Sequence, residues 1–385
     1  MRLSRAVALA LALSTLALGA CSSKGKLRQP TKLVELAKPE LRPVEIWSRS
    51  AGNGGGKFFT GLRLSKEADG IFVAAVDGSV YALNPANGGT IWRTATKARV
   101  ISGPTVADDK IYVGTLDGET IALQRATGKE LWRTRVNSEV LAAPVASGDV
   151  VVVRSVDGRE FGLSSKDGER LWNFDRTEPN LTLRGLSEPL ILGGRVYSGM
   201  DNGKLVALNL NDGQVAWEQN ISVAAGRSEL ARLTDIDADL LSAPAGLFVV
   251  TYANDIALVD PLSGESRWRR SIKSYSGMAT DDKNVYVTDD EGLLWALDAE
   301  TGAAVWKQEA LKYRHLSAPA VFGGYIVVGD FQGYLHWFEP KDGRLVARTR
   351  AGSAPIASAP VVDGKRLYVT SQSGLVAAYE AQAAK

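Results

Sequence analysis

The stretch DGSVYALNPANGGTIW, residues 77–92, decides the fold because the same pattern returns without gaps at residues 117–132 and 157–172. In each copy an Asp-Gly pair predicts a tight turn, and the β-branched and apolar run after it predicts a buried strand. A second turn then leads to a Trp that can bury its ring against a neighbouring sheet. More divergent copies begin further along the chain, at Asp201, Ala253, Glu291, Gln332 and Ser373. The chain is therefore a repeat protein with eight copies of one hairpin.

Each hairpin is preceded by two further short strands. One follows a proline signal, such as Ser102-Gly103-Pro104 or Ala143-Pro144, and the other is a β-branched run, such as Ile111-Tyr112-Val113. Four short antiparallel strands recurring about every 40 residues are typical of a β-propeller blade, and no helical period appears. We therefore predict an all-β fold, an eight-bladed β-propeller of four-stranded antiparallel blades.

The Trp-bearing strand shows how the ring closes. It follows seven of the hairpins, although one copy has Ala347 at the Trp position, and the last copy, residues 373–380, lacks it. Trp47, in contrast, precedes every hairpin and has no hairpin of its own. We predict that this N-terminal strand completes the last blade, so that residues 41–385 form one ring without an open edge.

Composition narrows the class of function. The 385 residues include 45% apolar and 23% charged side chains, as in ordinary folded proteins. Lys plus Arg number 45 and Asp plus Glu number 43, and this balance argues against a nucleic acid as partner. One Cys excludes a disulfide framework. The two histidines, His315 and His336, are interpreted as structural, and Trp295 and Trp337 as blade packing. No cofactor or metal is predicted.

The first twenty residues have the features of a secretory signal peptide: Arg2 and Arg5, then an apolar run from Ala6 to Ala17. The next residues, Leu18-Gly19-Ala20-Cys21, resemble the lipobox of bacterial lipoproteins, in which the Cys receives the lipid. The alternative is an ordinary signal peptide with an unrelated Cys. We expect residues 1–20 to be removed and residues 21–40 to form a flexible, solvated tether that is lipid-anchored at Cys21. With Ser22 next, the resemblance implies an outer-membrane destination.

Two repeats are longer than the others. The distances between successive hairpin turns are 40, 40, 45, 50, 39, 41 and 41 residues. Both insertions fall between the last strand of one blade and the first strand of the next, so two enlarged loops on neighbouring blades should form one raised patch. We expect hairpin turns such as Asp77-Gly78 on the opposite face. The first loop contains Leu181, Leu183 and Arg184, residue types that protein interfaces favour, although the leucines could instead pack under the loop.

The string ALDAETGAAVW, residues 296–306, resembles the repeat of the quinoprotein propellers. This resemblance implies an alternative function, a periplasmic dehydrogenase that depends on pyrroloquinoline quinone (PQQ). Those enzymes are typically longer, many carry an adjacent Cys pair, and they hold calcium with side chains on a central platform. No inserted segment with such a cluster is evident here. A propeller that binds cell-wall sugars is a further alternative.

A lipobox, a tether and eight such blades in fewer than 400 residues together resemble the BamB family, the propeller lipoproteins of the outer-membrane β-barrel assembly (BAM) machinery. The resemblance implies a non-catalytic scaffold at the periplasmic face of the outer membrane. It also implies docking to the POTRA domains of the BamA-type barrel insertase, indirect contact with other BAM lipoproteins, and unfolded outer-membrane proteins as a further candidate partner. The family's Leu-x-Leu-Arg and Asp-x-Asp loops correspond to Leu181, Leu183 and Arg184, and to Asp235 and Asp237.

Overall fold

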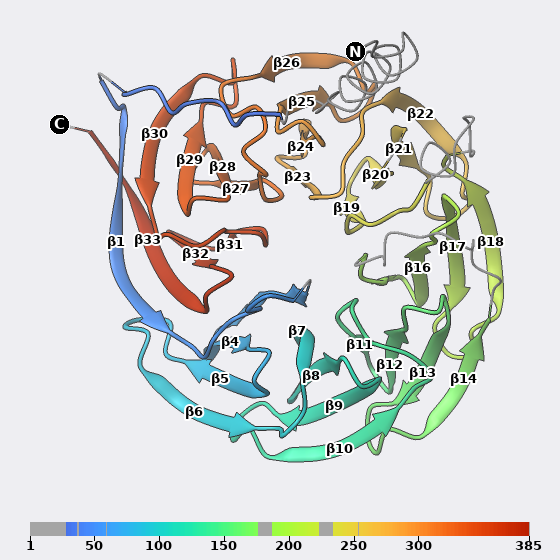
Figure 1. Cartoon of the computed structure of the whole chain (residues 1–385). Coiled ribbons are helices and arrows are strands. Elements are labelled where there is room, and N and C mark those ends of the chain that lie inside the picture. The colour runs from blue at the N-terminus through green and yellow to red at the C-terminus, as the bar shows by residue number, and fades with distance from the viewer. Residues whose placement is uncertain are drawn as a thin grey trace, which may run out of the picture.

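The computed structural model describes residues 28–36, 38–58, 60–175, 187–222, 234–252 and 254–384. These residues form eight sheets arranged in a ring (Figure 1). Seven sheets have four strands and one has five, and all pairs within the blades are antiparallel except one short parallel pair. The predicted eight-bladed propeller is therefore confirmed. In the part of the chain that is described, no helix has the length and hydropathy needed to cross a membrane.

The blades follow the chain around the ring, each running from an inner strand to an outer one. Blade 1 comprises β3 (Leu64–Glu67), β4 (Gly70–Ala74), β5 (Ser79–Leu83) and β6 (Thr90–Ala95). Blade 2 comprises β7 (Val100–Ala107), β8 (Lys110–Thr115), β9 (Glu119–Gln124) and β10 (Glu130–Arg135), with β2 (Gly61–Leu62) as an extra innermost strand. Blade 3 comprises β11 (Val145–Ser147), β12 (Val150–Arg154), β13 (Glu160–Ser164) and β14 (Arg170–Phe174). Blade 4 comprises β15 (Leu190–Leu192), β16 (Arg195–Gly199), β17 (Lys204–Asn209) and β18 (Val215–Asn220).

The second half of the ring repeats this arrangement. Blade 5 comprises β19 (Leu241–Ala243), β20 (Gly246–Val250), β21 (Asp255–Val259) and β22 (Ser266–Ser271). Blade 6 comprises β23 (Met278–Thr280), β24 (Asn284–Thr288), β25 (Leu294–Asp298) and β26 (Ala304–Gln308). Blade 7 comprises β27 (Ala320–Phe322), β28 (Tyr325–Gly329), β29 (Tyr334–Phe338) and β30 (Leu345–Arg350). Blade 8 comprises β31 (Val361–Asp363), β32 (Arg366–Thr370), β33 (Leu375–Ala383) and β1 (Leu41–Ser50).

The repeated Gly and Trp positions hold neighbouring blades together. Trp268 on the outer strand of blade 5 donates from Nε1 to the carbonyl of Ala299 in blade 6, at 3.1 Å. Its ring lies over Gly302, which has a φ of 69°, and a Cβ on that glycine would lie 2.6 Å from the ring. Only glycine fits both the backbone and the ring. The same contact recurs for Trp47 with Gly88, Trp92 with Gly128, Trp132 with Gly168, Trp172 with Gly213, Trp217 with Gly264, and Trp306 with Gly343.

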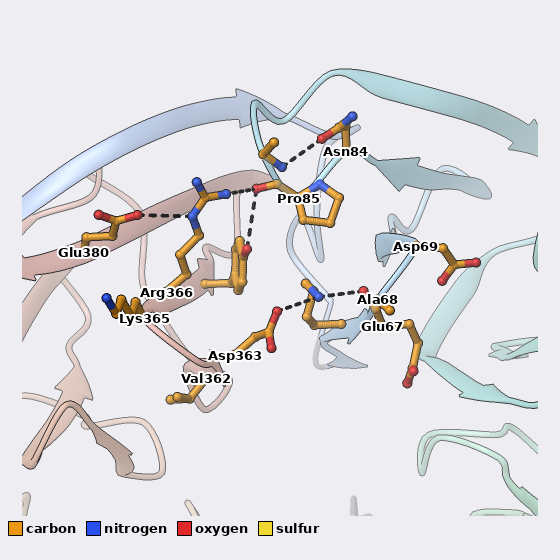
Figure 2. Close-up of a pocket in the computed structure, with 13 residues that line it drawn as sticks. Glu67, Ala68, Asp69, Asn84, Pro85, Val362, Asp363, Lys365, Arg366 and Glu380 are labelled. Atoms are coloured by element: carbon orange, nitrogen blue, oxygen red, sulfur yellow. Dashed lines mark hydrogen bonds and ion pairs between the residues drawn. The ribbon is translucent and has the colours of Figure 1, made fainter.

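The ring closes through the N-terminal strand, as predicted. β1 pairs antiparallel with β33, from Leu41 opposite Ala383 to Ser50 opposite Leu375. Trp47 Nε1 donates to the carbonyl of Pro85 in blade 1 at 3.0 Å, and Arg366 of blade 8 donates to the same carbonyl at 2.6 Å. Figure 2 shows Arg366 and Pro85 beside the open groove between blades 8 and 1. The two ends of the propeller are thus joined without a covalent link.

This closure explains why Ala347 stands where other blades have Trp. In every other blade the Trp ring is received by the turn between the third and fourth strands of the next blade. The third strand of blade 8 is β33 and the fourth is β1, which come from opposite ends of the chain, so no such turn connects them. A Trp at position 347 would have neither the glycine nor the turn carbonyl to contact. Ala347 is instead fully buried in the apolar cluster between blades 7 and 8.

The hairpin turns lie on the same face of the ring as the connections between blades. The residue after β6, Thr96, donates its backbone N–H to the carbonyl of Gly78, and Val136 after β10 does the same to Gly118. The prediction that the Asp77-Gly78 turn lies on the opposite face was therefore wrong. The reason is that successive strands of an antiparallel sheet run in opposite directions, so the second and the fourth strand of a blade end at the same edge.

The described part of the proposed tether, residues 28–36 and 38–40, runs from the outer strand of blade 7 inward across blades 6 and 7 (Figure 1). Thr31 donates from its backbone N and its Oγ1 to the carbonyl of Lys312, at 2.9 and 3.0 Å. Arg348 donates to the carbonyl of Val34 at 2.8 Å, and Glu40 pairs with Arg344. These contacts attach the segment more firmly to the ring than the sequence suggested.

Candidate functional site

The two long connections lie where the repeat spacing placed them. One runs from the end of β14 at Phe174 to Leu190 of β15, and the other from the end of β18 at Asn220 to Leu241 of β19. Their described ends flank blade 4, and the second connection leaves the ring on the face that carries the hairpin turns, because Ile221 donates to the carbonyl of Gly203. Three residues predicted for the site, Leu181, Leu183 and Arg184, lie outside the described residues, as does Cys21.

Asp235 and Asp237 are both described, and they differ in exposure. Asp235 is fully buried, and its backbone carbonyl accepts a hydrogen bond from Tyr252 N at 2.9 Å. Ile236 between them is also fully buried and packs against Gly199 so closely that a Cβ on that glycine would overlap its side chain. Asp237 retains partial exposure. The central Ile of the Asp-x-Asp segment therefore packs between blades 4 and 5, and of the two Asp residues only Asp237 reaches the surface.

A buried ion pair lies beside this segment. Arg154 at the end of β12 donates to Asp201 Oδ1 at 2.6 Å, and both side chains are almost fully buried. Burial raises the pKa of Asp237 to about 7, and the charges of Asp235 and Asp201 act in the same direction, whereas Arg154 opposes them. Asp237 Oδ1 is buried without a hydrogen-bond partner among the described residues. A buried carboxyl oxygen without a donor favours the protonated form, in agreement with the raised pKa.

A hydrogen bond and two ion pairs link the ends of the two connections. The backbone N of Glu188 donates to Asp239 Oδ1 at 2.9 Å, and Arg63 lies within 2.8 Å of Glu188 and 3.0 Å of Asp239. Burial raises the pKa of Glu188 to about 8; Asp239 acts in the same direction, while Arg63 opposes it. The sequence analysis missed these three residues because no local motif marks them.

Stability should decrease as pH rises from about 5 to about 9. Folded Glu188 and Asp237 keep protons that the unfolded chain releases near pH 4. Their contribution to the free energy of unfolding is therefore complete below pH 4. It is lost as pH rises through the folded pKa values of about 8 for Glu188 and about 7 for Asp237. The double variant Glu188→Gln, Asp237→Asn cannot titrate at these positions. Its urea midpoint should therefore fall less over this range, and an equal fall in both proteins would contradict the assignment.

The other side chains considered from the sequence have structural roles. His336 is fully buried, lies 3.0 Å from Asp330 through Nε2 and accepts from Arg348 at Nδ1. Burial lowers its pKa, so the ring is neutral and donates to Asp330. Trp337 is fully buried in the apolar cluster between blades 7 and 8. Within the described ranges, no three His, Cys, Asp or Glu side chains are grouped so that they could hold a metal ion.

Comparison with known proteins gives the family. The sequence model of a family described as outer membrane protein assembly factor BamB matches residues 76–308 and 298–385. The chain belongs to the BamB family. Over 97% of its length it is 46% identical to outer membrane protein assembly factor BamB of Pseudomonas aeruginosa, of which it covers 98%. The BamB crystal structure from Moraxella catarrhalis superimposes with a TM-score of 0.80 at 27% identity, covering 88% of this chain and all of that one.

Quinoprotein enzymes share the BamB propeller at a greater distance. Quinohemoprotein alcohol dehydrogenase from Comamonas testosteroni matches with a TM-score of 0.70 over 91% of this chain and 78% of its own length, but at 14% identity. A likeness at this level shows a common fold and no common activity. The resemblance to BamB seen in the sequence is confirmed, and the quinoprotein resemblance is confirmed for the fold alone.

Proposed function

We propose that the chain is a non-catalytic lipoprotein scaffold of the outer-membrane protein assembly machinery. It docks the POTRA domains of the BamA-type barrel insertase and so assists the folding and insertion of β-barrel proteins. The observation that carries the proposal is membership of the BamB family, whose matched relatives are named outer membrane protein assembly factors. The relative from Pseudomonas aeruginosa matches over nearly the whole length of both chains. Other BAM lipoproteins are contacted indirectly, and unfolded outer-membrane proteins are a further candidate partner.

The docking surface proposed here combines the two long connections. Leu181 and Leu183 supply apolar anchors and Arg184 supplies a planar donor group, a combination that interface hot spots favour. Asp237 supplies a partly exposed carboxyl group, which fits a basic or N–H-bearing partner. Asp235 is buried and acts within the loop base, holding Asp237 in place. The ring beneath holds Asp237 in place before the partner arrives.

Two features of the ring support a non-catalytic role over the quinone-dependent alternative. Arg63 beside the innermost strand of blade 2 forms ion pairs with Glu188 and Asp239, so these acidic groups already have a cation as partner. Within the described ranges no three His, Cys, Asp or Glu side chains are grouped as metal ligands. These observations favour the scaffold over an enzyme that holds calcium beside a quinone. Adding PQQ and Ca²⁺ to the protein should leave its absorbance spectrum equal to the sum of the separate spectra.

The proposal is tested by purifying the full chain from detergent-solubilised envelopes and identifying the proteins that accompany it. Recovery of the barrel insertase in stoichiometric amount is the expected result. A quinone-dependent dehydrogenase would instead be recovered without the insertase and would reduce an artificial electron acceptor when PQQ and Ca²⁺ are supplied. If neither the insertase nor dehydrogenase activity is found with the protein, although the insertase is intact in the same extract, the scaffold function is contradicted.

Attachment to the outer membrane should depend on Cys21. The variant Cys21→Ser has no thiol to acylate, so it should either be released to the soluble periplasmic fraction or remain uncleaved. Fractionation of envelopes by density, followed by mass measurement of the protein, distinguishes these products. The conservative change Ser22→Thr serves as a control and should leave the protein in the outer membrane. A Cys21→Ser protein that is processed and still tightly bound would show that the lipobox interpretation is wrong.

A further inference from the structure

Arg63 follows the innermost strand of the ring. β2 pairs in parallel with β7, with Gly61 opposite Ser102, which makes it the fifth and innermost strand of blade 2. The backbone N of Arg63 donates to the carbonyl of Gly103 at 3.0 Å. Gly61 lies so close to the carbonyl of Leu141 that a Cβ would overlap it. The backbone from residue 61 to 63 is therefore held firmly inside the ring.

The Arg63 side chain reaches from this support to the ends of both long connections. Its Nη1 lies 2.8 Å from Glu188 Oε2 and 3.0 Å from Asp239 Oδ2. Glu188 comes two residues before β15 of blade 4, and Asp239 comes two residues before β19 of blade 5. One guanidinium group thus joins Glu188 and Asp239, which are 51 positions apart in the chain and lie near the ends of the two candidate docking loops.

The charges in this group make Arg63 hard to replace. The Arg63 side chain is 27% exposed, that of Glu188 is 15% exposed and that of Asp239 is 45% exposed, so the contact with Glu188 is the more buried of the two. Without the guanidinium, the carboxyl groups of Glu188 and Asp239 would lie close together with no cation between them. Removing Arg63 would leave the buried Glu188 carboxyl without this donor, which is unfavourable locally, whereas the more exposed Asp239 would be solvated by water.

We propose that Arg63 is a positioning residue for partner docking, which holds the bases of the two long connections in one arrangement. The inference rests on the proposed function, in which those connections bind the insertase. Arg63 acts through Glu188 and Asp239 and contributes by fixing these described ends of the connections before the partner binds. The ring itself is closed by β1 and by the Trp contacts, so it does not depend on this group.

The test compares three variants in the full chain purified in detergent. Arg63→Met removes the link, and the triple variant Arg63→Met, Glu188→Gln, Asp239→Asn removes it without leaving an unpaired charge, so that it remains foldable. Arg366→Met is the matched control, because its side chain is 29% exposed and pairs with Glu380 at the junction of blades 8 and 1. Purified periplasmic domains of the insertase are titrated against each protein, and hydrogen exchange is measured on peptides covering residues 187–192 and 234–243.

We expect both Arg63 variants to bind at least tenfold more weakly and to exchange faster in these two peptides alone, while the control resembles the wild type in both. Wild-type affinity and exchange in a folded Arg63 variant would overturn the proposal. Faster exchange with unchanged affinity would overturn the docking role but leave the proposed function standing. A wild-type chain that does not bind the insertase domains would overturn the proposed function as well, whatever the exchange shows.

Discussion

Co-purification with the barrel insertase should be lost when Leu181, Leu183 and Arg184 are all replaced by alanine. Truncation of a central hot-spot residue typically costs about 2 kcal/mol or more, which is roughly a thirtyfold loss of affinity for each anchor. Three such losses would reduce even nanomolar binding to a level that does not survive washing. The measurement is titration of purified insertase domains against the variant, alongside its circular dichroism and thermal midpoint. Wild-type affinity in a well-folded triple variant would place the docking surface elsewhere.

The two Asp residues of the second connection provide a contrast for this experiment. Asp237→Asn keeps the size of the side chain and removes the charge that it carries above its pKa of about 7, so at pH 8 it should weaken association, with less dependence on salt, and leave the fold intact. Asp235→Asn alters a fully buried carboxyl group and should lower the unfolding midpoint as well. If both variants weakened binding equally without a change in stability, Asp235 would face the partner and the structural distinction between them would be wrong.

The blades and their closure could be predicted because the same local chemistry is copied along the chain. Asp-Gly turns, β-branched runs and Trp each act within a few residues, and Trp47 without a hairpin of its own indicated how the ring closes. The partner of each Trp could not be predicted in this way. The Gly that appears in the same copy as a Trp contacts the Trp of the preceding blade, as Gly302 contacts Trp268. The repeat thus encodes an interface between copies.

The candidate site was predictable in its position but not in its details. Repeat spacing located the two long connections, because extra residues in a closed ring have to leave it between blades. The burial of Asp235 was not visible, since an Asp-x-Asp segment in a loop suggests exposure, and only packing of Ile236 against Gly199 reverses this. Arg63 was missed because its partners are supplied by the closed ring and no nearby sequence indicates them.

Removal of β1 should open the ring. A chain that starts at Ala51 lacks this strand, whereas one that starts at Leu41 lacks only the segment attached to blades 6 and 7. The first should have a lower unfolding midpoint and should aggregate, because it exposes the edge of β33 and loses the buried ring of Trp47. Loss of a buried aromatic side chain alone costs about 3–5 kcal/mol, out of a typical total of about 5–15 kcal/mol. The second chain should keep most of the stability, and equal midpoints for the two would contradict closure by β1.

Because the closing strand is held only by hydrogen bonds and packing, it can also be supplied as a separate molecule. A synthetic peptide of residues 38–52 should raise the midpoint of the chain that starts at Ala51 in proportion to the logarithm of peptide concentration. The same peptide with Trp47→Ala should act much more weakly, since it can pair with β33 but cannot fill the space over Gly88 or donate to Pro85. Equal rescue by both peptides would show that strand pairing closes the ring without the Trp. Rescue by the native peptide alone would show that blade 8 is joined to blade 1 through the Trp–Gly contact. Every other pair of neighbouring blades, except blades 7 and 8, is joined in the same way.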